Sequence, residues 1–203
     1  MGSTRREQVV AFLREHGIAR SRDIRALGVP PSTLMRMVEN GDVVQLARGL
    51  YQLPDTDFDA AHSLAEVARL VPKGVICLIS ALVYHGLTLQ MPSRVWLALP
   101  QGTWRPQFAY PPVKTVHMAR AAISAGVEHH KIEGVLVPIF SPAKTVADCF
   151  KFRSLVGVDV AIEGMQLALR KRKAKPQEIL DHASELRVAK IVRPYLEACI
   201  SDD

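Results

Sequence analysis

The sequence predicts an α+β protein: a small unit of helices and a hairpin comes first, then a larger mixed domain with a helical C-terminal end. Three observations lead to this class. Hydrophobic residues recur at helical spacing through the first forty residues, and two short strand-like runs joined by a glycine-containing turn come next. Further strand-like runs, separated by prolines, occupy the middle of the chain. Beyond Gly157 only helical patterns remain, and strands followed by helices without regular alternation are typical of α+β folds.

The composition is that of a folded protein with one generous domain or two small ones. Of the 203 residues, 48% are hydrophobic and 23% are charged, which excludes a disordered tail, a collagen-like repeat and a disulfide miniprotein. The chain carries 26 Lys and Arg against 20 Asp and Glu, and the resulting net charge of +6 favours an anionic partner. Composition alone does not establish that partner, because many basic proteins bind nothing acidic.

The sequence predicts neither a membrane span nor a disulfide framework. Its longest stretch without charged residues has an apolar core of only nine residues, Val75–Val83, whereas a bilayer needs about 20. No apolar segment of a secretion signal follows the N-terminal charges. The cysteines Cys77, Cys149 and Cys199 lie far apart in apolar surroundings, so we expect buried thiols. We therefore expect a cytoplasmic protein.

Three short helices are expected in the first forty residues. Thr4 and Glu7 have the spacing of a capping box, so a first helix should begin there and end at Gly17. Ser21 is placed to cap a second, shorter helix. A third helix should run over residues 31–40, because Pro is tolerated in the first turn of a helix and the following Asn-Gly pair is a stop signal.

A hairpin should follow these helices. Residues 43–46 and 50–53 are strand-like, and Ala47-Arg48-Gly49 predicts a three-residue loop with Gly49 in the left-handed conformation. Three helices and a hairpin within about 50 residues are the element order of a winged helix-turn-helix. The sequence therefore predicts a DNA-binding domain of this type over residues 1–54.

The third helix has the two faces that a recognition helix needs. Leu34, Met37 and Val38 fall on one side and should pack on the other helices, whereas Ser32 and Arg36 fall on the opposite side. Arg can bridge the O6 and N7 atoms of guanine, and hydroxyl groups can donate to phosphates or to base edges. The predicted DNA contacts come from this helix, from the loop of the hairpin and from the start of the second helix: Arg20, Arg22, Ser32, Thr33, Arg36 and Arg48.

A second interpretation of these arginines stays open. An Arg on the outer face of a helix is often simply solvated, and Glu39 would repel phosphate if it faced the groove. Residues 1–50 hold 8 Arg and 5 acidic residues, an excess that gives only a modest electrostatic attraction to DNA. The element order, more than any single residue, favours DNA binding.

The remainder of the chain predicts a second domain over residues 60–203, after a polar linker at residues 55–59. The three aspartates of this linker lack the glycine and the downstream glutamate of a calcium loop, so we expect them to be solvated. Within the second domain, helices are expected over residues 60–71, 80–86, 141–151, 159–173, 176–186 and 188–200, and strands over residues 95–99, 115–118 and 135–139.

Candidate chemistry in the second domain is sparse. His129 and His130 are adjacent, and in a strand they would point to opposite faces, so the pair is a poor metal site. His85 could serve in acid–base chemistry or could only interact with the end of a helix. The basic run at residues 170–175 could be solvated or could hold an acidic partner. Phosphate-binding glycine loops and hydrolase motifs are missing from the sequence, so we expect no enzyme, no cofactor and no metal.

Several segments resemble the AbiEi-type antitoxins of bacterial type IV toxin–antitoxin systems, which act in abortive infection. The similarity begins with Pro-Ser-Thr-Leu-Met-Arg at 31–36 and the hairpin at 41–54. It continues with Ile-Ser-Ala-Leu-Val-Tyr-His-Gly-Leu-Thr at 79–88, Gly-Val at 126–127 and Ser-Pro-Ala-Lys-Thr-Val-Ala-Asp at 141–148. The resemblance covers most of the chain to about residue 155, and the combination of segments is more specific than the hairpin alone.

The resemblance implies a regulator that represses its own promoter through an inverted repeat in double-stranded DNA. It also implies that the second domain carries the antitoxin activity against a nucleotidyltransferase-like toxin encoded beside it, without a stable complex between the two. Within the last segment, Lys144, Thr145 and Asp148 can be explained by structure alone, as a polar helix start with a buried partner.

Three functional hypotheses follow from the sequence. The first is a non-enzymatic repressor and antitoxin, with the helix at residues 31–40 in the major groove and the wing at residues 43–53 on the backbone or minor groove. The second is a nucleotide-handling enzyme or nuclease that the N-terminal domain targets to DNA. The third is a winged-helix module that binds protein. A nucleotidyltransferase would need a Gly-Ser pair followed by acidic metal ligands, which the sequence lacks.

Overall fold

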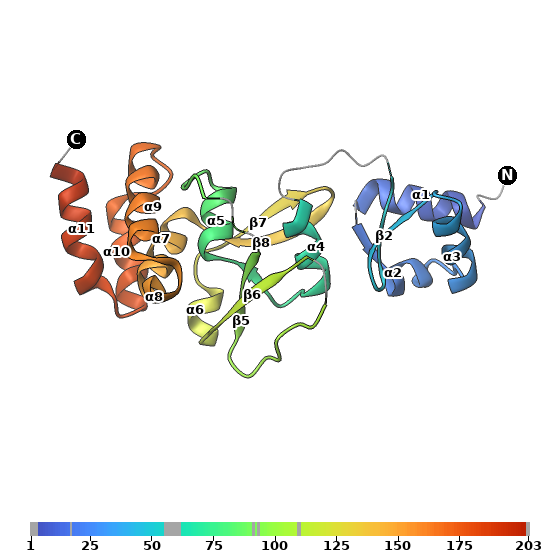
Figure 1. The fold of residues 1–203 in the computed structure, drawn as a ribbon, viewed down its shortest axis with the longest axis horizontal. Coiled ribbons are helices and arrows are strands. Elements are labelled where there is room, and N and C mark those ends of the chain that lie inside the picture. The colour runs from blue at the N-terminus through green and yellow to red at the C-terminus, as the bar shows by residue number, and fades with distance from the viewer. Residues whose placement is uncertain are drawn as a thin grey trace. The chain divides into compact units, whose positions relative to one another are not determined.

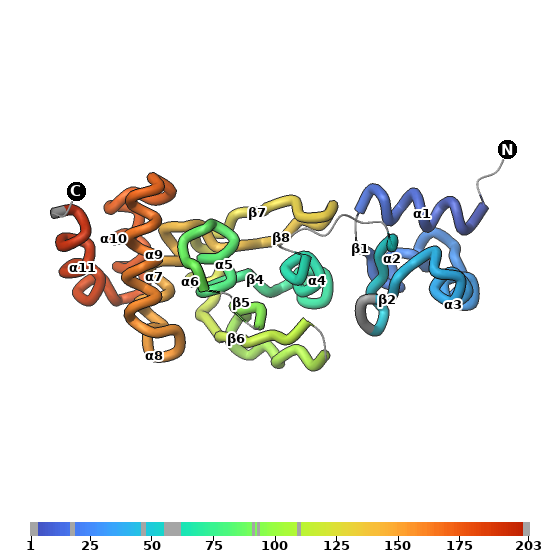
Figure 2. The backbone as a smooth tube through the Cα atoms, turned by 45° about the horizontal axis from the view of Figure 1, so that its top comes forward, coloured from blue at the N-terminus to red at the C-terminus, as the bar shows by residue number. Residues whose placement is uncertain are grey.

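The chain folds into two compact units, which are shown in Figures 1 and 2. The first unit contains residues 1–72, 106–112 and 129–137, and the second contains the remaining segments, 73–105, 113–128 and 138–203. Helices and sheets occur in mixed order, so the expected α+β class is confirmed. The predicted linker at residues 55–59 lies outside the described residues. The computed structural model describes residues 4–16, 18–54, 62–90, 92, 94–108 and 111–201.

The first unit begins with three helices and a three-stranded antiparallel sheet in which β3 lies between β1 and β2. The sequence predicts the helices and the hairpin but not β1, because a three-residue strand is too short to show alternation. A fourth helix, α4, packs against β1 and β3. The elements are α1 (Arg5–His16), β1 (Ile18–Arg20), α2 (Ser21–Ala26), α3 (Pro31–Glu39), β2 (Val44–Ala47), β3 (Leu50–Gln52) and α4 (His62–Leu70).

The first helix begins where the sequence predicts. The Glu7 N–H donates to Thr4 Oγ1 over 3.3 Å, and the Thr4 N–H donates to Glu7 Oε2 over 2.9 Å, so the capping box is present. The expected stop at Gly17 lies outside the described residues. One apolar core joins the three helices to the sheet, and it consists of Val9, Leu13, Ala19, Ile24, Val29, Leu34, Met37, Val43 and Tyr51.

The start of α2 differs from the prediction. Ser21 is the first helical residue and not the cap, because β1 continues to Arg20 and the chain passes directly from strand to helix. The N–H of Ser21 donates to the carbonyl oxygen of Gly49 in the hairpin (2.9 Å), and the Asp23 carboxylate accepts from the N–H of Arg20 (3.3 Å). Ser21 therefore contacts the hairpin through its backbone N–H, and its side chain does not cap the helix.

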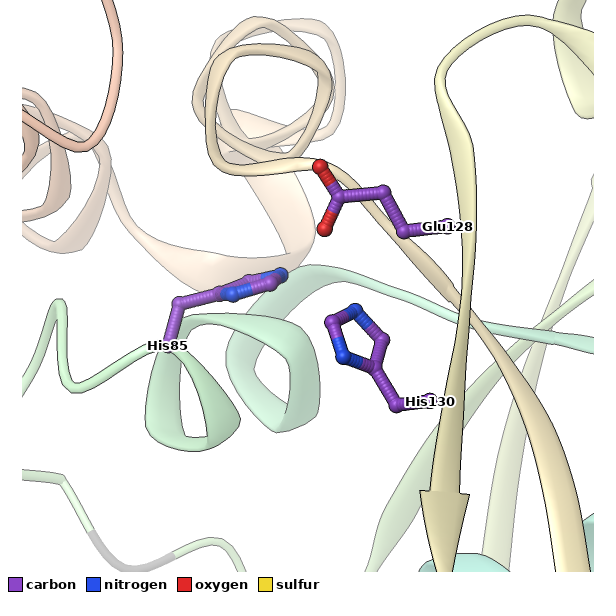
Figure 3. A group of neighbouring side chains, drawn as sticks. All are labelled: His85, Glu128 and His130. Carbon is purple, nitrogen blue, oxygen red and sulfur yellow. The ribbon is translucent and has the colours of Figure 1, made fainter.

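The second unit contains most of a five-stranded mixed sheet, in the order β6-β5-β4-β8-β7, and the helical C-terminal end. Strand β5 pairs in parallel with β6 and antiparallel with β4, and β4 pairs in parallel with β8. The predicted strands and long helices are present. The sequence missed β4, α6 and α8, and it gave β7 only as a strand or turn around the adjacent His129 and His130, the second of which is labelled in Figure 3. The elements are β4 (Val75–Ile76), α5 (Leu78–Tyr84), β5 (Val95–Pro100), β6 (Val113–Met118), α6 (Arg120–Ser124), β7 (Val127–Ile132), β8 (Val135–Phe140), α7 (Pro142–Lys151), α8 (Arg153–Val156), α9 (Val158–Arg170), α10 (Pro176–Glu185) and α11 (Ala189–Ser201).

Helix α7 is the central element of the helical end, because it packs against α5, α9, α10 and α11. It begins as predicted, since the Oγ of Ser141 accepts from the N–H of Lys144 over 3.3 Å and Pro142 occupies the first helical position. Helix α5 begins earlier than predicted, at Leu78. Ser80 lies inside this helix, where its Oγ accepts from the N–H of Trp96 (2.9 Å) instead of capping.

Candidate nucleic-acid interface

Helix α3 has one buried and one exposed face, as the sequence predicts. Leu34 and Met37 are buried, whereas Ser32 and Arg36 are exposed. Met35 lies on the exposed side as well, with 48% of its surface accessible. The apolar face anchors the helix to the core, and the exposed side chains of α3 offer a hydroxyl, a thioether, a guanidinium and, at its C-terminal end, the carboxylate of Glu39.

The N-terminus of α3 is set by two prolines. Pro30 precedes the helix in extended conformation and offers no side-chain cap, and Pro31 occupies its first turn. Thr33 is half-buried, and its N–H donates to the carbonyl oxygen of Pro30 over 3.0 Å. The exposed Ser32 therefore lies at the positive end of the helix dipole, where an anion is favoured.

Arg48 is exposed in the turn between β2 and β3. The loop is tighter than predicted, because Ala47 still pairs with Leu50 and only Arg48 and Gly49 form the turn. Gly49 has a φ of +78°, so the expected left-handed residue is confirmed. Since the Gly49 carbonyl accepts from the N–H of Ser21, the turn that carries Arg48 is tied to the start of α2.

Arg20 and Arg22 lie in different environments although they are close in sequence. Arg22 is exposed, and its Nε lies 3.5 Å from Asp23 Oδ1. Arg20 is half-buried on β1, and its Nη2 has no hydrogen-bond partner among the described residues. Burial lowers the pKa of Arg20, and the neighbouring charge of Arg22 lowers it further. The side chain of Arg22 is therefore accessible to a ligand in solvent, whereas that of Arg20 is only partly accessible.

Arg25 is a further candidate, which the sequence pattern did not single out. Arg25 is exposed on α2 and lines a surface hollow of about 220 Å³ together with Pro31, Met35 and Tyr51. Ser21 and Leu34 complete this lining. A helical projection of α2 could have found it, because Ile24 is the buried residue of this helix and the residue next to it faces outward.

The polar residues singled out in the second unit have structural contacts. Lys144 and Asp148 are fully buried and paired with each other, and the buried Thr145 donates from Oγ1 to the Phe140 carbonyl oxygen over 3.1 Å. In the basic run, Lys171 Nζ donates to the carbonyl oxygen of Gly86 (2.7 Å), and Lys173 Nζ donates to that of His85 (2.8 Å). These two lysines therefore stabilise the C-terminal end of α5.

Two of the three cysteines are buried as expected, and the third is not. Cys77 and Cys149 are fully buried free thiols, and Cys199 is partly exposed. Burial raises the pKa of Cys77 and of Cys149 well above the ordinary value, so both remain protonated at neutral pH. In the part of the chain that the structure describes, no helix combines the length and apolar character needed to cross a bilayer.

Comparison with solved structures shows a fold in common with a mycobacterial protein. The crystal structure of the RV2827C protein from Mycobacterium tuberculosis superposes with a TM-score of 0.60 over 99% of this chain and 82% of that chain, at 14% sequence identity. At this identity the likeness concerns the fold alone. A search of curated proteins found no match.

Comparison with family models supports the resemblance given by the sequence. Residues 7–54 match the model of the transcriptional regulators described as AbiEi antitoxins. The matched segment contains α1, β1, α2, α3 and the β2–β3 hairpin, and with them all six predicted DNA contacts. The N-terminal segment of this chain is therefore similar to that of the AbiEi antitoxin transcriptional regulators.

Proposed function

We propose that this protein is a sequence-specific DNA-binding repressor of its own promoter and the antitoxin of a type IV toxin–antitoxin system. In this proposal residues 1–54 form a winged helix-turn-helix, with α3 in the major groove and the β2–β3 hairpin as the wing. The observation that carries it is α3 itself, which buries Leu34 and Met37 and presents Ser32 and Arg36 to solvent. The family match over residues 7–54 adds to the same conclusion.

Some of these residues would contact base edges, and others would contact the DNA backbone. Arg36 and Ser32 would read base edges, because a guanidinium can bridge guanine and a hydroxyl can donate. Thr33, at the first turn of α3, would hold a nearby phosphate. Arg48, at the turn of the hairpin, would enter the minor groove or bind a phosphate. These contacts agree with the exposed or half-buried state of all four side chains.

The remaining two residues would bind the DNA backbone from the α2 side. Arg22 is exposed and suited to a phosphate contact. Arg20 would also contact the DNA backbone, but its guanidinium is half-buried and offers fewer N–H groups to DNA. We therefore expect a smaller loss of affinity from Arg20→Ala than from Arg22→Ala.

The regulatory context extends the proposal. Repression through an inverted repeat needs a dimer or paired monomers on the two half-sites. The second domain would counteract a nucleotidyltransferase-like toxin encoded beside this gene, and the protein would act in the cytoplasm without catalysis of its own. The alternatives are an enzyme targeted to DNA and a protein-binding winged helix. Co-expression with the neighbouring gene tests the antitoxin role, which requires that this chain restore growth.

Fluorescence anisotropy of the intact chain on the DNA upstream of its gene tests the DNA-binding proposal. Random DNA of equal length is the reference, and the measurement is repeated over a salt series because phosphate contacts make affinity fall with salt. Arg36→Ala should weaken binding to the upstream DNA by about 1–3 kcal/mol, or about 5- to 150-fold, and relax preference at one base pair.

Arg14→Ala is the matched control, because Arg14 is an exposed arginine on α1 outside the proposed contacts. It should leave the upstream preference unchanged. Weak binding of equal strength to both DNAs would refute sequence-specific recognition and favour the protein-binding alternative. Equal losses in Arg14→Ala and Arg36→Ala would refute the role of α3 as the reader.

A further inference from the structure

The surface hollow of about 220 Å³ is lined by residues of α2, α3 and β3, all of which belong to the first unit. Leu34 and Tyr51 are buried members of the core, whereas Met35 and Arg25 are exposed. The hollow therefore combines an apolar wall with a cationic group. Pockets that enclose a whole small molecule commonly measure about 300–1,000 Å³, so this hollow is better suited to one edge of a larger ligand.

Met35 belongs to the same exposed face of α3 as the residues proposed to read DNA. At about 100° per residue, Ser32 lies between Met35 and Arg36 around the helix, and the three positions span about 100°. All three side chains are exposed, and 48% of the surface of Met35 is accessible. A ligand that meets Ser32 and Arg36 in the major groove therefore also meets Met35.

The hollow also borders the segment that is tied to the turn of the hairpin. Ser21 lines the hollow, and its N–H donates to the carbonyl oxygen of Gly49 over 2.9 Å. Gly49 follows the exposed Arg48 in the turn between β2 and β3. The hollow therefore adjoins both elements, α3 and this turn, that the proposed function places on DNA, and this position favours DNA as its occupant.

Arg25 supplies the charge that complements a phosphate group. Its Nε donates to the carbonyl oxygen of Ser21 over 3.4 Å, a contact that orients the guanidinium at the hollow. Among the described residues, no carboxylate pairs with Arg25, whereas the exposed Arg6 is paired with Asp42. The charge of Arg25 is therefore available to an anion in solvent.

We propose that the hollow receives one thymine nucleotide of the bound DNA, whose C5-methyl group contacts Met35 and whose strand is held at a phosphate by Arg25. Thymine follows from the chemistry of the two surfaces. Its methyl group is the apolar feature that base pairs present in the major groove, and the side chain of Met35 carries no hydrogen-bond donor. This inference rests on the proposed function and adds a second base to the guanine expected at Arg36.

Replacement of thymine by uracil tests the methyl contact, because uracil pairs as thymine does and lacks only the methyl group. Each thymine of the upstream DNA is replaced in turn, and binding of the full chain is measured by fluorescence anisotropy. At one thymine of each half-site, the replacement should weaken binding about fourfold, which is the loss expected when one methyl group is missing from an apolar contact.

Variants of the chain assign this sensitivity to a residue. Met35→Gln should remove the sensitivity to uracil, and Met35→Leu should retain it because the side chain stays apolar. Leu27→Ala is the matched control, since Leu27 is an exposed apolar residue of the same unit that does not line the hollow. Arg25→Ala should reduce the salt slope by about 1 for each bound chain and keep the sensitivity to uracil. Circular dichroism checks that each variant folds.

The outcomes separate this inference from the proposed function. A sensitivity at one thymine that Met35→Gln abolishes and Leu27→Ala retains supports it. Equal affinity for every uracil-containing DNA, or a sensitivity that persists in Met35→Gln, overturns it and leaves sequence-specific binding intact. An unchanged salt slope in Arg25→Ala also overturns it, because the hollow then does not meet the DNA backbone. Equal binding of the wild-type chain to upstream and random DNA would refute the proposed function, and this inference with it.

Discussion

The ammonium group of Lys144 lies 2.5 and 2.6 Å from the two carboxylate oxygens of Asp148, one turn farther along α7, and both side chains are fully buried. Lys144 Nζ also lies 4.4 Å from the centroid of the Phe140 ring. Burial raises the pKa of Asp148 to about 6, although the attraction of Lys144 lowers it. The desolvation of the carboxylate therefore outweighs the attraction within the pair.

Lys144→Met should destabilise the protein by about 3–5 kcal/mol at pH 8, because it leaves the Asp148 carboxylate buried without a counter-charge. The penalty should shrink toward pH 5. The pKa of Asp148 is already raised, and loss of the lysine raises it further, so the carboxyl becomes neutral as the pH falls. Urea unfolding at pH 8 and pH 5 measures both effects. The double variant Lys144→Met/Asp148→Leu should recover the stability at pH 8. Failure to recover it would show that the ion pair stabilises the fold beyond neutralising its own two buried charges.

Glu66→Gln should stabilise the first unit at pH 8 by about 1–3 kcal/mol. Glu66 is fully buried on α4, and neither carboxylate oxygen has a hydrogen-bond partner among the described residues. Burial raises the pKa of Glu66, and the nearby His62, whose Nε2 lies 3.8 Å away, partly opposes this.

The sign of the pH dependence follows from this raised pKa. A carboxyl group with a raised pKa in the folded state stabilises the fold below its unfolded pKa and loses that contribution as the pH rises through the folded value. The advantage of Glu66→Gln should therefore be present at pH 8 and vanish near pH 4. Thermal unfolding at the two pH values provides the measurement, and an advantage of equal size at both would contradict the assignment to charge burial.

Arg48→Ala should weaken DNA binding about equally on all sequences and reduce the salt slope by about 1. Arg48 is exposed at the turn of the hairpin, where a backbone contact is expected. Anisotropy titrations on the upstream and random DNA, each over several salt concentrations, measure the slope. A change in base preference without a change in slope would instead make Arg48 a reader of bases.

Gly126→Ala should destabilise the second unit by about 2–4 kcal/mol. Gly126 has a φ of +63°, and a Cβ there would lie 2.8 Å from the Cβ of the buried Lys144. Gly102 is the matched control, because its φ is +79° and a Cβ there would meet nothing within 4 Å. Gly102→Ala should therefore pay only the backbone strain, about 1–2 kcal/mol. Chemical denaturation of both variants measures the difference in the free energy of unfolding. Equal losses of stability would show that the close approach to Lys144 adds nothing to the backbone strain.

Local pattern was sufficient for the N-terminal helices and their faces. The Thr4–Glu7 capping box, the outward Arg36 and the left-handed Gly49 could all be predicted, because each depends on residues only a few positions apart. Ser21 and Ser80 were assigned as caps by the same local logic, and both assignments were wrong. In each case a hydrogen bond to a distant segment determines how the residue is used.

Patterns in the sequence were enough to predict the α+β class, the two faces of α3 and the N-terminal likeness to AbiEi regulators. These follow from hydrophobic periodicity and turn residues, which act over short distances along the chain. The burial of Lys144 together with Asp148 and the half-buried position of Arg20 became visible only in the folded chain. The reason is that the burial of these side chains depends on how helices and strands far apart in sequence pack around them, which no local period encodes.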